Sequence, residues 1–262
     1  MATKIQVGEL PREVVPGLFW LGTCGEIGFQ GKIIHSPWNA FLVRGAERTV
    51  LIDTGAPSGW PVVSAQLARV LGDRPLDYVF PTHPELPHMG NLPWLLQEHP
   101  GLRVVGDLRN YHLYLPEHRH RFEHRGRGDR IELGGRALVL LEAAIRDLPN
   151  TLWAYDTGGK ALFVSDGFGY SHAHEAGQCG LTAEELPEEP SVDHTAWITY
   201  NALSWAPYVD PRRYFGRLDR LFEEWPVEIL CPAHGSVVTR PELMIPIMKQ
   251  GLIEAHAGTL FR

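Results

Sequence analysis

Residues 82–91 read Thr-His-Pro-Glu-Leu-Pro-His-Met-Gly-Asn, and this stretch is the most informative one for the fold. His83 and His88 are five positions apart, so on a continuous helix they would diverge by about 140° and could not share a metal ion. Two prolines exclude such a helix in any case. In an extended loop His83 and Glu85 project to the same side, and a turn at Pro87 brings His88 round. The stretch therefore predicts a loop that presents two imidazoles and a carboxylate to one cavity.

Three other segments place a metal-competent side chain beside an apolar run. Asp166 follows the run that ends at Val164, and His234 follows the run that ends at Cys231. Asp147 precedes a further apolar run. Each of these alone is typical of a turn or a strand end. In combination with residues 82–91, and in this order, they indicate a metal site built from strand ends.

Apolar runs bounded by Gly, Pro or Asp predict strands in both halves of the chain. The predicted strands cover 17–22, 39–44, 49–53, 78–81, 136–141, 152–155, 161–164 and 227–231. Apolar residues at helical spacing, with their start and stop signals, predict helices over 60–71, 195–205, 211–224 and 241–255. Two strand-rich halves, each followed by helices, predict an α/β protein in which two sheets lie between helical layers. We expect one domain over residues 1–262, a length that allows a full core.

Charge and composition exclude several classes of protein. The net charge of −7 argues against nucleic-acid binding, which needs a clustered excess of Lys and Arg. The one basic stretch, 117–130, interleaves acids with bases and predicts a solvated face or a lid. The first 17 residues lack the apolar core of a signal peptide, and no apolar run is long enough to span a membrane. We therefore expect a cytoplasmic protein without membrane or nucleic-acid partners.

Cysteine spacing predicts reduced thiols. Cys24, Cys179 and Cys231 lie far apart in the chain and form no Cys-x-x-Cys pair. This spacing argues against a disulfide framework and against a thiolate zinc site, so we expect buried thiols in a reducing compartment. The thirteen histidines are a high count, and the open question is which of them converge.

The order of the motifs resembles the metallo-β-lactamase superfamily. It runs Leu-Ile-Asp-Thr-Gly at 51–55, His83-x-Glu85-x-x-His88, Asp166, and His234-Gly235. Within the superfamily, Glu85 resembles the flavodiiron proteins and the related oxygen-binding diiron proteins, because hydrolytic members usually have His there. Residues 38–42, 148–153, 165–169 and 231–235 are also similar to that branch. The resemblance runs over nearly the whole chain and implies an αββα sandwich. The flavodoxin domain of true flavodiiron proteins is missing from this sequence, so no flavin is expected.

The resemblance also implies a site for two metal ions. The implied ligands are His83, Glu85 and Asp147 for one ion, His88 and His234 for the other, and Asp166 as a bridge between them. The sequence departs from the family at two of these positions. Pro87 stands where the family has an Asp ligand, and Asp147 stands where it has His. Pro87 cannot ligate through its side chain and Asp147 could be an ion-pair partner or turn cap, so a site for one metal ion stays an alternative.

The ligand types favour iron. One imidazole and three carboxylates form a hard, oxygen-rich set suited to iron or manganese. His88, His234 and Asp166 have the composition of the two-His, one-carboxylate triad of non-haem iron, with positions open for dioxygen or substrate. We therefore predict two metal ions, iron first and zinc or manganese as alternatives, with the second ion as the reactive one.

Three residues outside the ligand set are candidates for supporting roles. Asp53 is expected to order the site through hydrogen bonds rather than to bind metal. His172 follows the bridging Asp166 and is a candidate to line the catalytic pocket, with a surface or cap role as the alternative. Tyr200 lies on a helix that passes near the metals in the similar family. It is a candidate hydrogen-bond donor to a metal-bound oxygen species, or an ordinary core residue.

Three functions fit these observations. The first is a non-haem diiron oxidoreductase or oxygenase that binds or activates dioxygen or a related small molecule such as nitric oxide, with electrons from a separate donor or from the substrate. The second is a hydrolase that uses a metal-bound hydroxide on an ester, lactone or phosphoester. The third is a non-catalytic dioxygen-binding sensor. The resemblance further implies a homodimer.

Overall fold

Two β-sheets form the centre of the computed structural model, which describes residues 9–258. The first sheet has the strand order β1 (Arg12–Val15), β2 (Leu18–Phe29), β3 (Lys32–Arg44), β4 (Thr49–Ile52), β5 (Tyr78–Phe80), β6 (Arg103–Gly106) and β7 (Phe122–His124). The second has the order β12 (Ile229–Cys231), β11 (Ala161–Phe163), β10 (Leu152–Asp156), β9 (Ala137–Glu142) and β8 (Arg130–Glu132). Strands β4 to β7 are parallel, as is the pair β11 and β12, and the remaining pairs are antiparallel.

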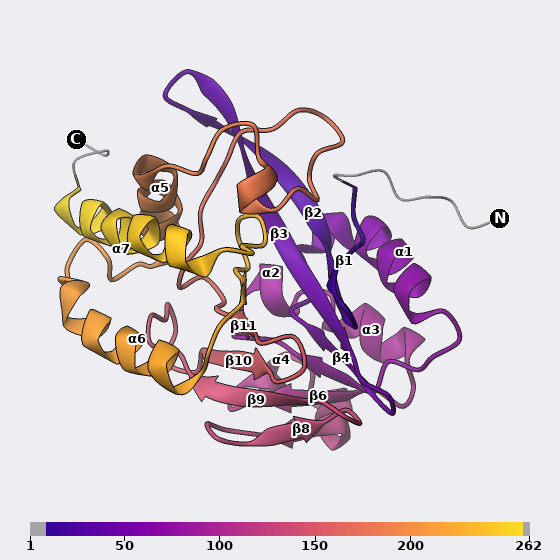
Figure 1. Cartoon of the computed structure of the whole chain (residues 1–262). Coiled ribbons are helices and arrows are strands. Elements are labelled where there is room, and N and C mark those ends of the chain that lie inside the picture. Colours follow the sequence, from indigo (N-terminus) through magenta and orange to yellow (C-terminus); the bar gives the residue numbers. More distant parts are fainter. Residues whose placement is uncertain (1–8, 259–262) are drawn as a thin grey trace.

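Helices cover the outer face of each sheet. The helices are α1 (Trp60–Leu71), α2 (Leu86–Met89), α3 (Leu92–Glu98), α4 (Tyr111–Tyr114), α5 (Val192–Ala202), α6 (Arg212–Glu224) and α7 (Pro241–Ala257). Short 3₁₀ turns are η1 (Pro57–Gly59), η2 (Pro116–Arg121) and η3 (Ala183–Glu185). In Figure 1, α1 and α3 lie on one side of the sheets, and α5, α6 and α7 lie on the other. The predicted αββα sandwich is confirmed.

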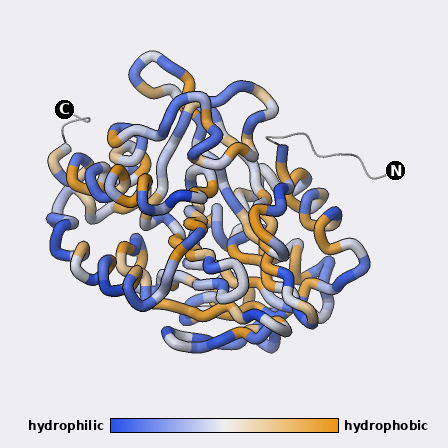
Figure 2. Tube along the Cα trace, viewed as in Figure 1, coloured by the Kyte–Doolittle hydropathy of each residue, from blue (hydrophilic) through white to orange (hydrophobic). Residues whose placement is uncertain are grey.

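The sequence of β2 shows why the layers form. Successive side chains of a strand point to opposite faces. Leu18 and Trp20 enter the core between the sheets, whereas Phe19 and Leu21 pack in the core shared with α1. Both faces of this part of the strand are therefore buried, and Figure 2 shows the corresponding hydrophobic interior. A run that is apolar at every position is what a strand between two layers requires.

Most predicted elements agree with the structure, with one informative exception. Strands β2 and β3 are much longer than the predicted strands 17–22 and 39–44. They continue as one hairpin from the pair Leu18 and Val43 to the pair Phe29 and Lys32. The apolar pattern stops earlier because the outer part of the hairpin is only partly buried and pairs through its backbone. The hairpin protrudes from the sandwich in Figure 1 and forms a wall beside both sites described below.

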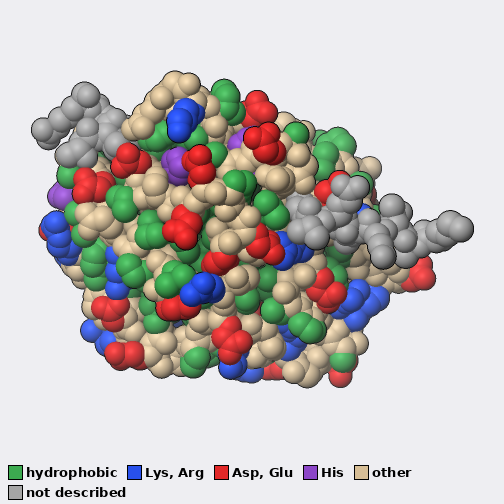
Figure 3. Space-filling model, turned by 45° about the horizontal axis from the view of Figure 1, so that its top comes forward, with side chains coloured by type: hydrophobic (Ala, Val, Ile, Leu, Met, Phe, Trp, Pro, Cys, Tyr) green, Lys and Arg blue, Asp and Glu red, His purple; other side chains and the backbone are tan. Residues whose placement is uncertain are grey.

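Three further expectations concern the surface and the N-terminus. The first expectation concerns the 17 N-terminal residues, which lack the apolar core of a signal peptide. Residues 1–8 of this segment lie outside the residues that the structure describes. No helix within residues 9–258 is long and apolar enough to cross a membrane. The basic stretch 117–130 lies at one edge of the first sheet and is mostly exposed, with Glu123 paired to Arg103 and Arg125. On the face seen in Figure 3, acidic and basic side chains are interspersed.

Candidate metal centre

The ends of four strands meet at one edge of the sandwich. Asp53 follows β4, His83 lies just after β5, Asp166 lies just after β11, and His234 follows β12. β4 pairs with β5, and β11 pairs with β12, in both cases in parallel. The carboxyl ends of each pair therefore lie at the same edge of its sheet. Hydrogen bonds join the loops of the two sheets, including one from the backbone N–H of Leu152 to the carbonyl oxygen of residue 82 at 3.0 Å. The topology therefore gathers segments that are distant in sequence.

The segment 82–91 bends as its prolines require. Glu85 is extended, with φ −114° and ψ 159°, and the single helical turn α2 then begins at Leu86. The turn predicted at Pro87 is this helical turn, and it brings His88 back over His83. The ring centroids of the two histidines are 3.8 Å apart. The segment thus presents both imidazoles to one cavity, as the sequence predicts.

The carboxylate of Asp166 lies between two groups of donor atoms. Its Oδ2 atom is 3.8 Å from Nε2 of His83. Its Oδ1 atom is 3.4 Å from Nε2 of His88 and 3.4 Å from Nε2 of His234. Each oxygen therefore faces a different group, which is the arrangement of a carboxylate that bridges two cations.

Two overlapping groups of donors surround this carboxylate. On one side, Nε2 of His83 is 3.1 Å from Oδ2 of Asp147 and 3.7 Å from Oε2 of Glu85. Together with Asp166, one donor atom of each of these residues lies within 4.8 Å of all the others. On the other side, donors of His83, His88 and Asp166 meet the same criterion. His234 joins this side through Oδ1 of Asp166.

Buried donor atoms without hydrogen bonds show that the cluster fits metal ions. Among the described residues, four such atoms belong to it: Nε2 of His83, Nε2 of His88, Oδ2 of Asp147 and Oδ1 of Asp166. A buried polar atom without a hydrogen-bond partner is costly, and native proteins rarely leave one unless it has a specific role. Here four of them converge, and each is a nitrogen or oxygen that binds metals. The arrangement is therefore suited to metal coordination.

The opposite side of each donor is anchored. Nδ1 of each imidazole has a partner at 2.9 Å: Ser165 Oγ for His83, Asp53 Oδ2 for His88, and the carbonyl oxygen of Pro37 for His234. Oδ1 of Asp147 accepts a 2.8 Å hydrogen bond from the hydroxyl of Thr151. Such outer contacts fix the ring orientation of metal-binding histidines and leave Nε2 available for the metal.

Two of the anchoring residues have unusual backbone conformations. Asp53 and Ser165 are buried, and their φ angles are +56° and +52°, in a region that non-glycine residues rarely adopt. Strain of this kind concentrates at functional sites. Asp53 accepts hydrogen bonds from the backbone N–H of Thr82 at 2.7 Å and from its hydroxyl at 3.1 Å, in addition to the bond with His88. Asp53 thus makes the hydrogen bonds that its expected ordering role requires. Ser165, Thr82 and Thr151 were not singled out from the sequence, although each lies within four positions of a candidate ligand.

Opposite charges hold the cluster together. Burial by itself raises the pKa of Asp166, but the imidazoles of His88 and His234 outweigh it and hold the pKa well below its usual value. Burial raises the pKa of Asp147. For His88 burial lowers the pKa, but the carboxylates of Asp53 and Asp166 raise it well above its usual value. Positive charge is therefore favoured where the donors meet, which is the condition that a cation satisfies.

An open pocket of about 400 Å³ leads to the cluster. Its walls include Ser36 and Trp38 of β3 and Ile198 and Asn201 of α5. Pro87, which replaces an acidic ligand in the similar family, also lines this pocket. An apolar ring therefore faces the cavity there, and the His88 side of the cluster has fewer donors.

The structure does not place the two other candidate residues among these donors or along this pocket. Tyr200 is partly buried and packs against the core beneath α5. The α5 residues that line the pocket are spaced three and four positions apart, so Tyr200 falls on a different face of the helix. His172 is buried, its backbone pairs with His35 of β3, and its ring centroid is 5.2 Å from that of His174.

The cysteines differ from the sequence-based expectation. Cys231 is buried, but Cys24 and Cys179 are only half-buried and lie together beside His174. The interpretation of three separate buried thiols is therefore wrong. Spacing along the chain carried no signal, because the long β2–β3 hairpin brings Cys24 to a loop about 150 residues further on.

An αββα sandwich with histidines and carboxylates at the strand ends of both sheets defines a class of metal-binding fold. The sequence matches the model of the metallo-beta-lactamase superfamily over residues 36–186, and the chain belongs to this superfamily.

Similar proteins are named as oxidases and reductases. The chain is 22% identical to coenzyme F420H(2) oxidase of Methanocaldococcus jannaschii, over 89% of this chain and 58% of that protein. It is 30% identical to the anaerobic nitric oxide reductase flavorubredoxin of Klebsiella pneumoniae, over 77% of this chain and 41% of that protein. The flavodiiron protein of Giardia intestinalis has the same fold, with a TM-score of 0.72 at 18% identity, over 93% of this chain and 58% of that chain. The chain thus spans less than two thirds of the length of these relatives.

Proposed function

We propose that this protein holds two metal ions, iron first of all, and acts as a non-haem diiron oxidoreductase on dioxygen or a related small molecule such as nitric oxide. The observation that carries the proposal is the position of Asp166, whose two carboxylate oxygens face two different groups of donors. The names of the relatives, an F420H(2) oxidase and a nitric oxide reductase, support this class of chemistry.

The proposed ligands follow from the donor groups. His83, Glu85 and Asp147 bind the first ion, His88 and His234 bind the second, and Asp166 bridges them. Glu85 is the most exposed of these, with a side chain that is 50% exposed, so it is the ligand most free to adjust when an ion binds. Three carboxylates around the first ion form a hard donor set that favours iron or manganese over zinc.

The second ion has three protein ligands, because Pro87 supplies none. Two imidazoles and one carboxylate with open positions are the donor set of non-haem iron that binds dioxygen or substrate directly. When bound, the two ions would supply open coordination positions and would pass on the electrons that they receive from a donor. The protein's own residues orient the donors through Asp53 and Ser165 and form the pocket by which a small molecule reaches them.

Electrons must come from outside the described residues or from the substrate. The relatives extend well beyond the length of this chain, and one of them is named a flavorubredoxin. We infer that an electron donor outside the described residues, or the substrate itself, supplies the electrons. We also propose one domain and a cytoplasmic location, as the length and composition of the sequence predict, and a homodimer, as the sequence similarity implies.

A hydrolase is the second candidate, and membership of the superfamily favours it. A metal-bound hydroxide at the same centre could attack an ester, lactone or phosphoester. A sensor that binds dioxygen without turnover would use the same ligands. Glu85 and Asp147 argue against the hydrolase, because they replace softer imidazole donors with oxygen donors that suit iron.

Metal analysis and spectroscopy test the proposal. The protein is loaded with Fe²⁺ without oxygen, and iron content, optical spectrum and consumption of dioxygen or nitric oxide are measured with a chemical reductant. We expect about two iron ions per chain and reductant-dependent consumption, both lost in Asp166→Asn and kept in Asp77→Asn, whose carboxylate lies at Thr49. A colourless zinc protein that hydrolyses a chromogenic ester would establish the hydrolase instead. Oxygen binding without consumption would establish the sensor.

A further inference from the structure

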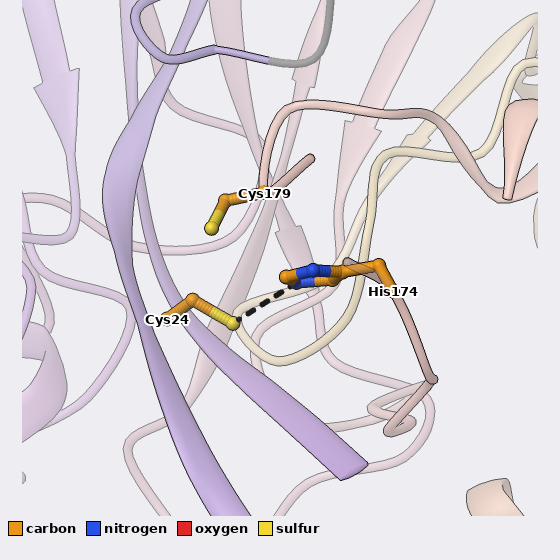
Figure 4. A group of neighbouring side chains, drawn as sticks. All are labelled: Cys24, His174 and Cys179. Carbon is orange, nitrogen blue, oxygen red and sulfur yellow. Dashed lines mark hydrogen bonds between the residues drawn. The ribbon is translucent and has the colours of Figure 1, made fainter. Parts of the chain in front are cut away.

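A second cluster of metal-binding side chains lies outside the candidate metal centre. Cys24 belongs to β2, and His174 and Cys179 belong to the loop between β11 and η3. Figure 4 shows Cys24 and His174 pointing toward one another across the gap between the hairpin and this loop, with Cys179 beside them. One donor atom of each residue lies within 4.8 Å of the other two.

The distances match those between ligands of one tetrahedral ion. With a Zn–S bond of about 2.3 Å and a Zn–N bond of about 2.1 Å, tetrahedral geometry separates a sulfur and a nitrogen ligand by about 3.6 Å. Sγ of Cys24 is 3.5 Å from Nε2 of His174. It is also 3.4 Å from Nδ1 of His35, so a second imidazole lies against the same sulfur. The ring centroids of His35 and His174 are 3.8 Å apart.

The orientation of His174 is that of a metal ligand. Its Nδ1 atom lies 2.8 Å from the carbonyl oxygen of Glu175, to which Nδ1–H donates. This contact selects the tautomer in which Nε2, the atom that faces Cys24, carries a lone pair. The same type of anchoring holds the histidines of the candidate metal centre, where a backbone carbonyl serves His234.

The sulfur atoms can be reached from solvent. The thiolate is the form of cysteine that binds metals, so an ion at this site displaces the thiol protons. Cys24 and Cys179 both line an open pocket of about 390 Å³, which gives an ion a path from solvent.

We propose that Cys24, His174 and Cys179 form a binding site for one borderline-soft divalent cation, Zn²⁺ above all, separate from the proposed diiron centre. Two thiolates and an imidazole are a donor set that selects zinc, whereas the carboxylate-rich centre selects harder ions. A water molecule or His35 completes the four ligands.

A cation at this site ties the outer part of the β2–β3 hairpin to the loop after β11. The two are already joined by backbone hydrogen bonds between His35 and His172, at 2.7 Å and 3.0 Å. The next residue of β3, Ser36, lines the pocket of the candidate metal centre. The ion therefore fixes a wall of that pocket without taking part in its donor groups.

Cobalt substitution tests the site independently of the iron centre. The metal-free full chain is titrated with Co²⁺, because thiolate-bound cobalt absorbs in the near ultraviolet by charge transfer and a carboxylate and imidazole centre has no such band. We expect one thiolate-bound cobalt per chain. The band should weaken to half or less in Cys24→Ser and in Cys179→Ser and disappear when both cysteines are replaced. It should persist in Asp166→Asn and in the matched cysteine control Cys231→Ala. Affinity for Zn²⁺ at this site should fall by more than about tenfold in both serine variants, because even outer-shell partners of a metal contribute that much.

X-ray absorption on the wild-type protein loaded with Zn²⁺ keeps the test valid if a serine variant fails to fold. Sulfur neighbours at about 2.3 Å from zinc support the site. A zinc spectrum with only nitrogen and oxygen neighbours overturns it, as does a cobalt band of unchanged intensity in Cys24→Ser. Thiol titration of the untreated protein provides the third outcome. If only one of the three cysteines reacts under denaturing conditions without reductant, Cys24 and Cys179 form a disulfide and the metal site is wrong.

Discussion

Asp53→Asn separates metal binding from folding at the candidate centre. The carboxylate of Asp53 accepts from the backbone N–H of Thr82 at 2.7 Å, from the Thr82 hydroxyl at 3.1 Å and from Nδ1–H of His88 at 2.9 Å. Asparagine has one acceptor oxygen and one NH₂ donor. If the oxygen stays on the Thr82 N–H, the NH₂ group faces His88, and Nδ1 must then become the acceptor. The ring proton moves to Nε2, which can no longer bind a metal.

The expected loss follows from this change of tautomer. Outer-shell partners of metal-binding histidines contribute about 10- to 100-fold in affinity, or about 1.4–2.8 kcal/mol. We expect this loss for the second metal ion, which His88 binds. The first ion should change little, because His83 is anchored by Ser165 instead. Titration of the metal-free variant with Fe²⁺ under nitrogen, or with Zn²⁺ by calorimetry, measures both affinities.

Asp77→Asn is the matched control. Asp77 accepts from the backbone N–H of Thr49 at 2.8 Å and from its hydroxyl at 3.3 Å, the same pair of contacts that Asp53 makes with Thr82. Within the described residues Asp77 has no histidine partner, so its variant should lose stability to urea without losing metal. The reasoning is refuted if a folded Asp53→Asn variant binds the second ion within about threefold of wild type, or if both variants lose metal equally.

Three further predictions concern other parts of the chain. Pro87→Asp places a carboxylate on the pocket wall, so affinity for the second metal ion should rise by about tenfold or more in competition with a chelator; unchanged affinity would show that this position does not face the ion. Gly235→Ala should destabilise the fold by about 1–3 kcal/mol in urea, because its φ is +114° and the added Cβ would lie 2.6 Å from the ring of Tyr170; wild-type stability would contradict this. The Arg12 hydrogen bond lowers the pKa of Glu185 from 4.5 to about 2, so this pair stabilises the fold above about pH 4.5 and the contribution disappears as the pH falls toward about 2. Because the Glu185 side chain is 39% exposed, Arg12→Ala should cost less than about 1 kcal/mol at pH 7, and a difference from wild type that grows in acid would refute the pairing.

The sequence by itself determined the αββα architecture and most of the histidines and carboxylates that the structure brings together. Apolar runs bounded by breakers mark strands because burial on both faces requires every side chain of a run to be apolar. The prolines of 82–91 restrict the backbone so strongly that His83, Glu85 and His88 had to share a loop or a short turn. The role of Asp53 followed from its place at a strand end, beside the residues that it anchors.

Only the tertiary structure decided how the histidines and carboxylates of the candidate metal centre divide into two groups around Asp166. It also decided which other side chains lie together. The two oxygens of Asp166 face different groups because two sheets converge on it, and no local pattern encodes that convergence. Tyr200 falls on a different face of α5 from Ile198 and Asn201, which line the pocket, and it packs against the core. Cys24 and Cys179 meet because the outer part of the β2–β3 hairpin reaches the loop after β11. The apolar pattern of the sequence does not mark this outer part as strand. Residues 150 positions apart come into contact because of the course that the whole chain takes between them, and no single segment determines that course.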